Sequence, residues 1–279
     1  MSRDRLGEFY GLNIWPMDPD TEAGRTRFKE AIEKFTKLMR HEFFKEVLSK
    51  DNKIKILEVC GGSGIGGCAL AKVLEKNGIE VSLCVTDIRE GDLEKAIKWI
   101  EGSKGIELKT KAMDAVDIDK LEERFDIILM YGLSTPHFSP WEMVRFLAAS
   151  GAILSERGIL IIEETDRRFF IFYLVKYKDL ITGKTLDNKI YMDIHTGYDP
   201  IRGVFKRTYS VIPGHPKLVD MESYLWGVAE MATFIWLFFE DVDIVKQDHR
   251  NYFVLGMRPR KKLLPDDLKP MPKTLMKNK

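Results

Sequence analysis

Apolar positions along the chain change their spacing in a regular way. Between residues 21 and 49 they recur every three or four positions, which predicts one amphipathic helix capped by Asp20 or Thr21. From residue 54, short apolar runs alternate with stretches of helical spacing. The expected strands are 54–59, 80–87, 106–113, 125–132 and 158–164, and the expected helices between them are 65–74, 91–101 and 140–155. Such alternation predicts a parallel sheet with helices on both faces.

Beyond residue 164 the alternation stops. Residues 166–181 are rich in aromatic side chains, and their spacing fits a helix and a buried strand equally well. Residues 189–212 form two β-rich runs around a turn, which predicts a hairpin. A helix over 222–239 and an antiparallel strand pair over 241–248 and 251–260 complete the pattern.

The fold class expected from this order is a doubly wound, mostly parallel α/β sheet of seven strands with helices on both faces. A closing antiparallel pair ends the sheet, and an inserted β-hairpin covers it. The expected parts are an N-terminal lid and helix (1–50), a cofactor-binding core (51–165), an inserted substrate cover (166–222), the end of the core sheet (223–258) and a flexible basic tail (259–279).

Composition narrows the class of protein. The chain has 279 residues with 44 Lys plus Arg against 43 Asp plus Glu, so it lacks the overall basic charge of many nucleic-acid binders. Its polar start contains no export signal, and its most apolar run, 232–239, is far shorter than the ~20 residues of a membrane span. We therefore expect a cytoplasmic protein without a membrane partner. Gln occurs only at Gln247, which is typical of heat-adapted proteins.

Cysteine and histidine spacing argues against a metal site. The three cysteines form no C-x-x-C pair, and no run of His and carboxylates has the spacing of metal ligands. We expect the cysteines to be small buried side chains, with neither a disulfide framework nor a bound metal.

A glycine-rich turn lies between the first expected strand and the helix after it. Residues 62–67 fit the pattern G-x-G-x-x-G in the place that a nucleotide-binding turn occupies. The same glycines also fit a plain tight turn. Ligand binding is favoured because open α/β sheets bind ligands at the carboxyl ends of their strands.

Three acidic residues follow successive strands. Glu58 ends the first strand and can reach a cationic amine near the turn. Asp87 ends the second, from which a carboxylate accepts both ribose hydroxyls. Asp114 ends the third, where it can accept from a purine amino group. Each alone fits a solvated loop acid, but together they match an amine, a ribose and an adenine.

These motifs resemble those of the class I S-adenosylmethionine-dependent methyltransferases. The segments 56–64, 85–87, 112–115 and 125–132 look like the first four motifs of that family, although Cys60 stands where the family usually has glycine. The resemblance implies S-adenosylmethionine as cofactor and S-adenosylhomocysteine as product. By the same resemblance, the cofactor-binding residues would be Glu58, Cys60, Gly61, Gly62, Gly64, Asp87, Ile88, Asp114, Ala115 and Tyr131.

Other functions remain open at this point. A nicotinamide-dependent dehydrogenase would share the glycine turn and Asp87, but it has no use for Glu58 or Asp114. A protein that binds the cofactor without turnover is also consistent. The ending of the chain is similar to the small-molecule branch of the methyltransferases, so the favoured acceptor is a nitrogen or oxygen atom of a small molecule. RNA, approached through the basic tail, and a protein side chain are the alternatives.

The loop after the fourth strand supplies the candidate catalytic residues, Tyr131 and His137. A histidine here can act as a general base, and it can equally cap the helix that follows. Tyr10 and Trp15 are candidates for an aromatic lid over the cofactor. Further candidates for the acceptor pocket are His195, His215, Glu163, Glu164, Asp166, Arg167 and Arg168.

Overall fold

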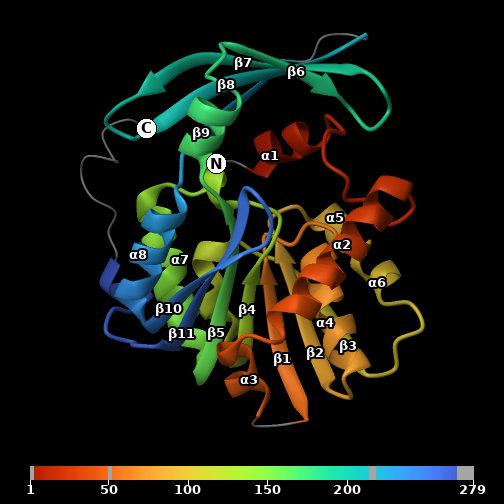
Figure 1. The fold of residues 1–279 in the computed structure, drawn as a ribbon, viewed down its shortest axis with the longest axis vertical. Coiled ribbons are helices and arrows are strands. Elements are labelled where there is room, and N and C mark those ends of the chain that lie inside the picture. The colour runs from red at the N-terminus through yellow and green to blue at the C-terminus, as the bar shows by residue number, and fades with distance from the viewer. Residues whose placement is uncertain (1–2, 50–51, 214–217, 269–279) are drawn as a thin grey trace.

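Two sheets organise the chain, and a computed structural model describes residues 3–49, 52–213 and 218–268 of it (Figure 1). The larger one, the core sheet, has the strand order β10-β11-β5-β4-β1-β2-β3. Its strands are β1 (Lys53–Val59), β2 (Glu80–Asp87), β3 (Ile106–Ala112), β4 (Phe125–Met130), β5 (Leu154–Thr165), β10 (Phe239–Lys246) and β11 (Asn251–Pro259). Strands β1 to β5 pair in parallel, and β11 pairs antiparallel with both neighbours. The predicted seven-stranded fold class is confirmed.

Helices cover both faces of the core sheet (Figure 1). One face carries α2 (Glu22–Leu38), α3 (Glu42–Leu48), α4 (Ile65–Lys76), α5 (Glu90–Leu93) and α6 (Ala96–Trp99), and the other carries α7 (Pro140–Ile153), α8 (Val228–Phe238) and a 3-10 segment, Ala115–Leu121. Successive residues of β1 point to opposite faces of the sheet. Ile54 and Ile56 belong to the buried apolar cluster on the α4 side, and Leu57 and Val59 belong to the cluster on the α7 side. The alternation also turns Glu58 toward the α4 side.

The N-terminal region differs in detail from its prediction. Thr21 caps α2 as expected, because its hydroxyl accepts from the Gly24 amide at 3.0 Å. The single predicted helix over 21–49 is wrong, since α2 ends at Leu38 and His41 caps a separate helix, α3. The apolar spacing continued through the break because both helices pack on the same face of the sheet. The predicted helix over 91–101 is likewise two short helices, α5 and α6.

A second, antiparallel sheet, the cover sheet, follows β5 in the chain. Its strands, in spatial order, are β6 (Leu180–Lys184), β7 (Ile190–Asp199), β8 (Val204–Ile212) and β9 (Val219–Tyr224). The predicted hairpin is β7 and β8, but it is flanked by two strands that the prediction missed. Because β9 pairs with β8, the predicted helix over 222–239 begins only at Val228. Of the two alternatives for the aromatic stretch, the helix fits better, because Phe169–Leu174 is a short π-helical segment without buried residues.

The cover sheet lies across the carboxyl ends of the core strands, with α1 (Arg3–Tyr10) beside it (Figure 1). A small apolar cluster joins them, made of Leu6, Phe9, Tyr209, Val219 and Met221. Within the described part of the chain, no helix is long and apolar enough to span a membrane.

The start of the predicted tail is packed on the fold. Pro265 is buried in a short 3-10 turn, and Leu268 packs against the α7 side of the core. Residues 269–279, which carry the rest of the predicted flexible tail, lie outside the described residues. The candidate His215 lies outside them too.

Candidate active site

The turn between β1 and α4 brings backbone close to other groups. The Gly61 amide donates to the Thr86 carbonyl at 2.9 Å, which ties the turn to β2. Gly62 and Gly64 adopt φ values of +55° and +80°, and Gly64 is the N-cap residue of α4. At Gly66 a Cβ atom would lie 2.5 Å from the Tyr131 Cβ. The glycines are therefore required by the packing of this turn as well as by its conformation.

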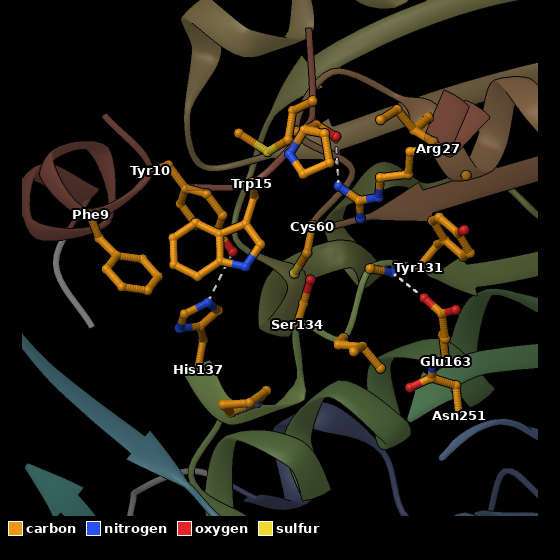
Figure 2. A pocket seen from close by; sticks show the side chains of 18 of the residues that line it. Phe9, Tyr10, Trp15, Arg27, Cys60, Tyr131, Ser134, His137, Glu163 and Asn251 are labelled. Atoms are coloured by element: carbon orange, nitrogen blue, oxygen red, sulfur yellow. Dashed lines mark hydrogen bonds between the residues drawn. The ribbon is translucent and has the colours of Figure 1, made fainter. Parts of the chain in front are cut away.

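Cys60 occupies a position that normally needs glycine. Its φ is +52°, in the left-handed region that residues with a Cβ rarely adopt. The departure from the family motif is therefore a side chain held in a glycine-like conformation, which costs of the order of 1–3 kcal/mol. The Cys60 side chain lies at the centre of the pocket in Figure 2.

Glu58 lies beneath the start of α4 and is buried. Burial raises its pKa to about 8, although amides of Gly67 and Gly66 act in the opposite direction. One carboxylate oxygen, Oε2, has no hydrogen-bond partner. The group is therefore suited to accept a proton or to pair with an incoming cation.

Asp87 is fully engaged within the protein. Its Oδ2 accepts from the Gly62 amide at 2.8 Å, and its Oδ1 from the Arg89 amide at 2.8 Å. The Arg89 guanidinium donates to the same two oxygens, from Nε at 3.2 Å and from Nη2 at 3.3 Å. A carboxylate has about four acceptor positions. Two of those of Asp87 accept from backbone amides, and the Arg89 guanidinium occupies the other two. The sequence analysis missed Arg89, whose only signal was its place two residues after Asp87.

A small cavity of about 70 Å³ brings together the residues expected around the adenosine. It is lined by Asp87 and Ile88 from the end of β2, by Asp114 and Ala115 after β3, and by Cys60. Asp114 Oδ1 accepts from the Val116 amide at 3.1 Å and so caps the segment that follows. Residues Leu6 and Tyr10 of α1 close this cavity from above.

A larger cavity of about 1060 Å³ lies next to it, between the core sheet and the cover sheet. Figure 2 shows that Tyr10, Trp15 and His137 gather at one end and Arg27, Tyr131 and Glu163 at the other, with Cys60 and Ser134 between them. Residues of β8 complete the lining on the cover side.

His137 forms the aromatic end with Tyr10. The Tyr10 hydroxyl and His137 Nε2 are 3.1 Å apart, and Nδ1 is buried without a partner. Burial, together with the nearby cations Arg167 and Arg89, lowers the pKa of His137 to about 3. The imidazole is therefore neutral at physiological pH and a weaker base than its ordinary pKa would make it. Above it, the Arg89 guanidinium lies 4.0 Å from the centre of the Tyr10 ring.

Tyr131 belongs to the charged end. Arg27 and Lys34 of α2 lie 5.8 Å and 5.6 Å from the centre of its ring. Burial, followed by the negative charge of Glu163, raises its pKa. Glu163 accepts from Lys34 Nζ at 2.7 Å and from the Gly132 amide at 2.9 Å. The sequence analysis missed Arg27 and Lys34, because cations on an amphipathic helix usually face solvent.

Of the remaining candidates, only Arg167 and Glu163 line the larger cavity. Asp166 caps the π-helical segment and Arg168 pairs with Glu230 at 2.9 Å. His195 bonds the Gly197 carbonyl at 2.9 Å within the cover sheet, and Glu164 is buried below the cavity. Gly64 shapes the turn but contacts neither cavity. Among the described residues, no three His, Cys, Asp or Glu side chains gather as a metal site would require.

Comparison with known proteins identifies the domain. A family model described as a methyltransferase domain matches residues 56–158. No curated protein matches the chain in sequence. Residues 56–158 therefore form the methyltransferase domain of a class I S-adenosylmethionine-dependent enzyme, and S-adenosylmethionine is its cofactor.

Solved structures share the fold at low sequence identity. A protein from Pyrococcus horikoshii is 19% identical, with a TM-score of 0.60 over 91% of this chain and 99% of its own. An S-adenosylmethionine-dependent methyltransferase from Clostridium acetobutylicum is 13% identical, with a TM-score of 0.59 over 81% of this chain and 92% of its own. The CcbJ methyltransferase from Streptomyces caelestis is 13% identical, with a TM-score of 0.54 over 77% of this chain and 87% of its own.

Proposed function

We propose that this enzyme transfers a methyl group to a nitrogen or oxygen atom of a small molecule bound under the cover sheet. The observation that carries the proposal is a cavity of about 1060 Å³ that is lined both by the glycine turn and by residues of β8. A concave cavity between two sheets suits a small molecule better than a polymer.

The residues at the strand ends fit the cofactor. The unpartnered Glu58 Oε2 is available to its amine, and the Cys60–Gly62 backbone lies open to its methionine portion. Arg27, at the charged end, is the cation available to its carboxylate. Asp87 and Ile88 would hold the ribose, and Asp114 and Ala115 would border the adenine.

The cofactor, when bound, supplies a methyl group already activated on a sulfonium, so this chain mainly needs to orient the acceptor and exclude water. Tyr10 and Trp15 close one end of the cavity. His137 lines the cavity next to Tyr10. Because its pKa is lowered to about 3, His137 positions the acceptor instead of titrating near neutral pH.

Methyl transfer into separated fractions tests the proposal. The full chain is incubated with S-adenosylmethionine carrying a radiolabelled methyl group and, in turn, with a small-molecule extract, RNA and protein. The expected label is in the small-molecule fraction only, and Asp87→Ala, with its weaker cofactor affinity, should incorporate less label at the same cofactor concentration. Label in RNA or protein, with none in small molecules, would overturn the proposed acceptor class.

His137 is tested by its conservative variant. We expect His137→Asn to keep most of the transfer activity and the wild-type pH profile, because an amide retains a hydrogen bond. A loss of a hundredfold or more, typical of losing a general base, would show that the histidine takes a proton.

A further inference from the structure

Two arginines line the larger cavity, one from each sheet. Arg207 is on β8 of the cover sheet, and Arg167 follows β5 of the core sheet. Strand residues point alternately to the two faces, so Phe205, Arg207 and Tyr209 share the face of β8 that lines the cavity. Lys206, between them in sequence, is exposed.

Each arginine has a buried nitrogen without a hydrogen-bond partner. Arg207 is only 9% exposed; its Nε donates to Asp193 Oδ1, while its Nη2 has no acceptor. Arg167 Nη2 donates to the Leu133 carbonyl at 2.9 Å, while its Nε is 4.0 Å from Glu164 Oε1 and makes no hydrogen bond. Leaving such a donor unsatisfied costs about 1–3 kcal/mol, and more when it is charged. Both donors therefore favour an acceptor oxygen in this part of the cavity.

Tyr209 lies on the same face of β8 as Arg207, and it lines the same cavity as Arg167. Its ring packs edge-on against Phe9 of α1, with 4.9 Å between ring centres. The arginines thus belong to one contiguous group under the cover sheet.

The carboxylates nearby do not fully balance these cations. Asp193 pairs with Arg207 through one nitrogen only. Burial raises the pKa of Glu164 to about 7, so it carries only part of a charge beside Arg167 at neutral pH. The lining also includes the apolar side chains of Phe170, Ile171, Ile181 and Phe205, together with a third cation, Arg250, 5.6 Å from the centre of the Phe170 ring.

We propose that the methyl acceptor carries an anionic oxygen group, a carboxylate or a phosphate, that binds Arg167 and Arg207. Guanidinium groups bind such anions through parallel hydrogen bonds, and buried ones are less screened by solvent. The apolar walls would hold the body of the acceptor, with its reacting atom toward Ser134 and His137. The inference rests on the proposed function, because it assigns one part of the cavity to the acceptor.

The experiment uses three ligands of similar shape and different charge. Benzoate, phenyl phosphate and the neutral benzamide are titrated by calorimetry into the full chain saturated with S-adenosylhomocysteine. We expect at least one anion to bind at least tenfold more tightly than benzamide. Tighter binding of benzoate identifies a carboxylate site, and tighter binding of phenyl phosphate a phosphate site.

Matched variants locate the anion. Arg207→Met should weaken its binding at least tenfold, and the exposed neighbour Lys206→Met should leave it unchanged. Because Arg207→Met leaves Asp193 buried without its partner, the double variant Asp193→Asn, Arg207→Met is measured as well, and it should show the same loss. Equal binding of benzamide and the anions, no binding of either anion, or wild-type binding by both Arg207 variants would overturn the inference.

The titration separates this inference from the proposed function. S-adenosylhomocysteine binding is measured first, in the same cell. If it fails in the wild type, the assignment of the cofactor site is wrong. If it succeeds and neither anion binds, only the anionic acceptor is wrong.

Discussion

The core sheet and the cover sheet bury their strands to different extents. Five of the seven residues of β1 are buried, whereas none of the five residues of β6 is. The central core strands β1, β4 and β5 are covered by helices on both faces, so their side chains are mostly apolar and only their carboxyl ends are free for chemistry, whereas the edge strand β3 has no buried residue. The cover sheet places Arg207 and Tyr209 along the middle of a strand facing the cavity.

This difference assigns different tasks to the two sheets. The ends of the core strands hold groups in fixed positions, which suits a cofactor that is the same in every turnover. The cover sheet contributes polar side chains from a strand face, where a substitution alters the pocket without disturbing the core. Variants at the core edge should therefore change stability and cofactor affinity, and variants on the cover sheet should change acceptor binding.

The largest effect is expected from Gly66→Ala at the core edge. The added methyl group would lie 2.5 Å from the Tyr131 Cβ and 2.6 Å from Glu58 Oε1, so the start of α4 must shift. Overpacking of this kind costs about 1–3 kcal/mol, or roughly 2–5 °C in melting temperature for a chain of this size. Cofactor binding should be lost with it.

Gly91→Ala is the matched control, because nothing lies within 4 Å of the added methyl group there. Thermal melting and calorimetry with S-adenosylhomocysteine measure both variants. Wild-type stability of Gly66→Ala would mean that the turn has more freedom than its packing indicates.

The second-largest expected effect is a loss of cofactor affinity on substituting Asp87. Removing a hydrogen bond to a charged group costs about 1.5–3 kcal/mol, so Asp87→Ala should weaken S-adenosylhomocysteine binding by roughly tenfold to a hundredfold. Asp220→Ala, on β9 of the cover sheet, should leave that affinity unchanged. Equal affinities for the two variants would contradict the assignment of cofactor binding to the core sheet and acceptor binding to the cover sheet.

The third prediction follows from the pKa of Glu58, which is raised to about 8 in the free protein. A cationic amine favours the carboxylate, so binding should release a proton and tighten as pH rises toward 8, by up to tenfold per unit. The same shift should make the free protein less stable as pH rises from 4.5 to about 8, since the unfolded chain loses the proton first.

Calorimetry in buffers of different ionisation enthalpy measures the released proton. Glu58→Gln keeps the shape of the side chain and should bind S-adenosylhomocysteine with an affinity that does not depend on pH. A wild-type affinity that is also constant between pH 6 and 8 would show that Glu58 does not meet the amine.

The smallest change in cofactor affinity is expected on substituting Arg89. Its guanidinium occupies the acceptor positions of Asp87 that ribose hydroxyls would use, so binding must displace it. Arg89→Met should therefore tighten S-adenosylhomocysteine binding by a few fold, of the order of 1 kcal/mol. Weaker binding by this variant would show that Arg89 contacts the cofactor instead of competing with it.

The sequence predicted the strands of the core sheet better than those of the cover sheet. The core strands, and the convergence of Asp87, Ile88, Asp114 and Ala115 on one cavity, were predictable, because buried parallel strands are short apolar runs and their ends meet at one edge. The cover strand β6 was not, because it contains Gly183, which interrupts an apolar pattern. In the structure the Tyr191 ring of β7 packs over this glycine, a tertiary contact that no local pattern reveals.

Cations that line the cavity were missed for a related reason. Arg27 and Lys34 occupy the polar side of α2, and Arg89 follows a strand end like many solvated residues. Their role depends on which element lies opposite, and sequence spacing within a helix or turn does not contain that information. Cys60 was recognised as a departure, but its left-handed backbone could be established only by the structure.

A crystal structure with S-adenosylhomocysteine tests the division between the two sheets most directly. The account predicts that the adenosine lies against Asp87, Ile88, Asp114 and Ala115, with Arg89 moved off the Asp87 carboxylate, and that the sulfur faces the cavity under β8. An adenosine bound against the cover sheet, or a sulfur facing away from Arg167 and Arg207, would contradict it.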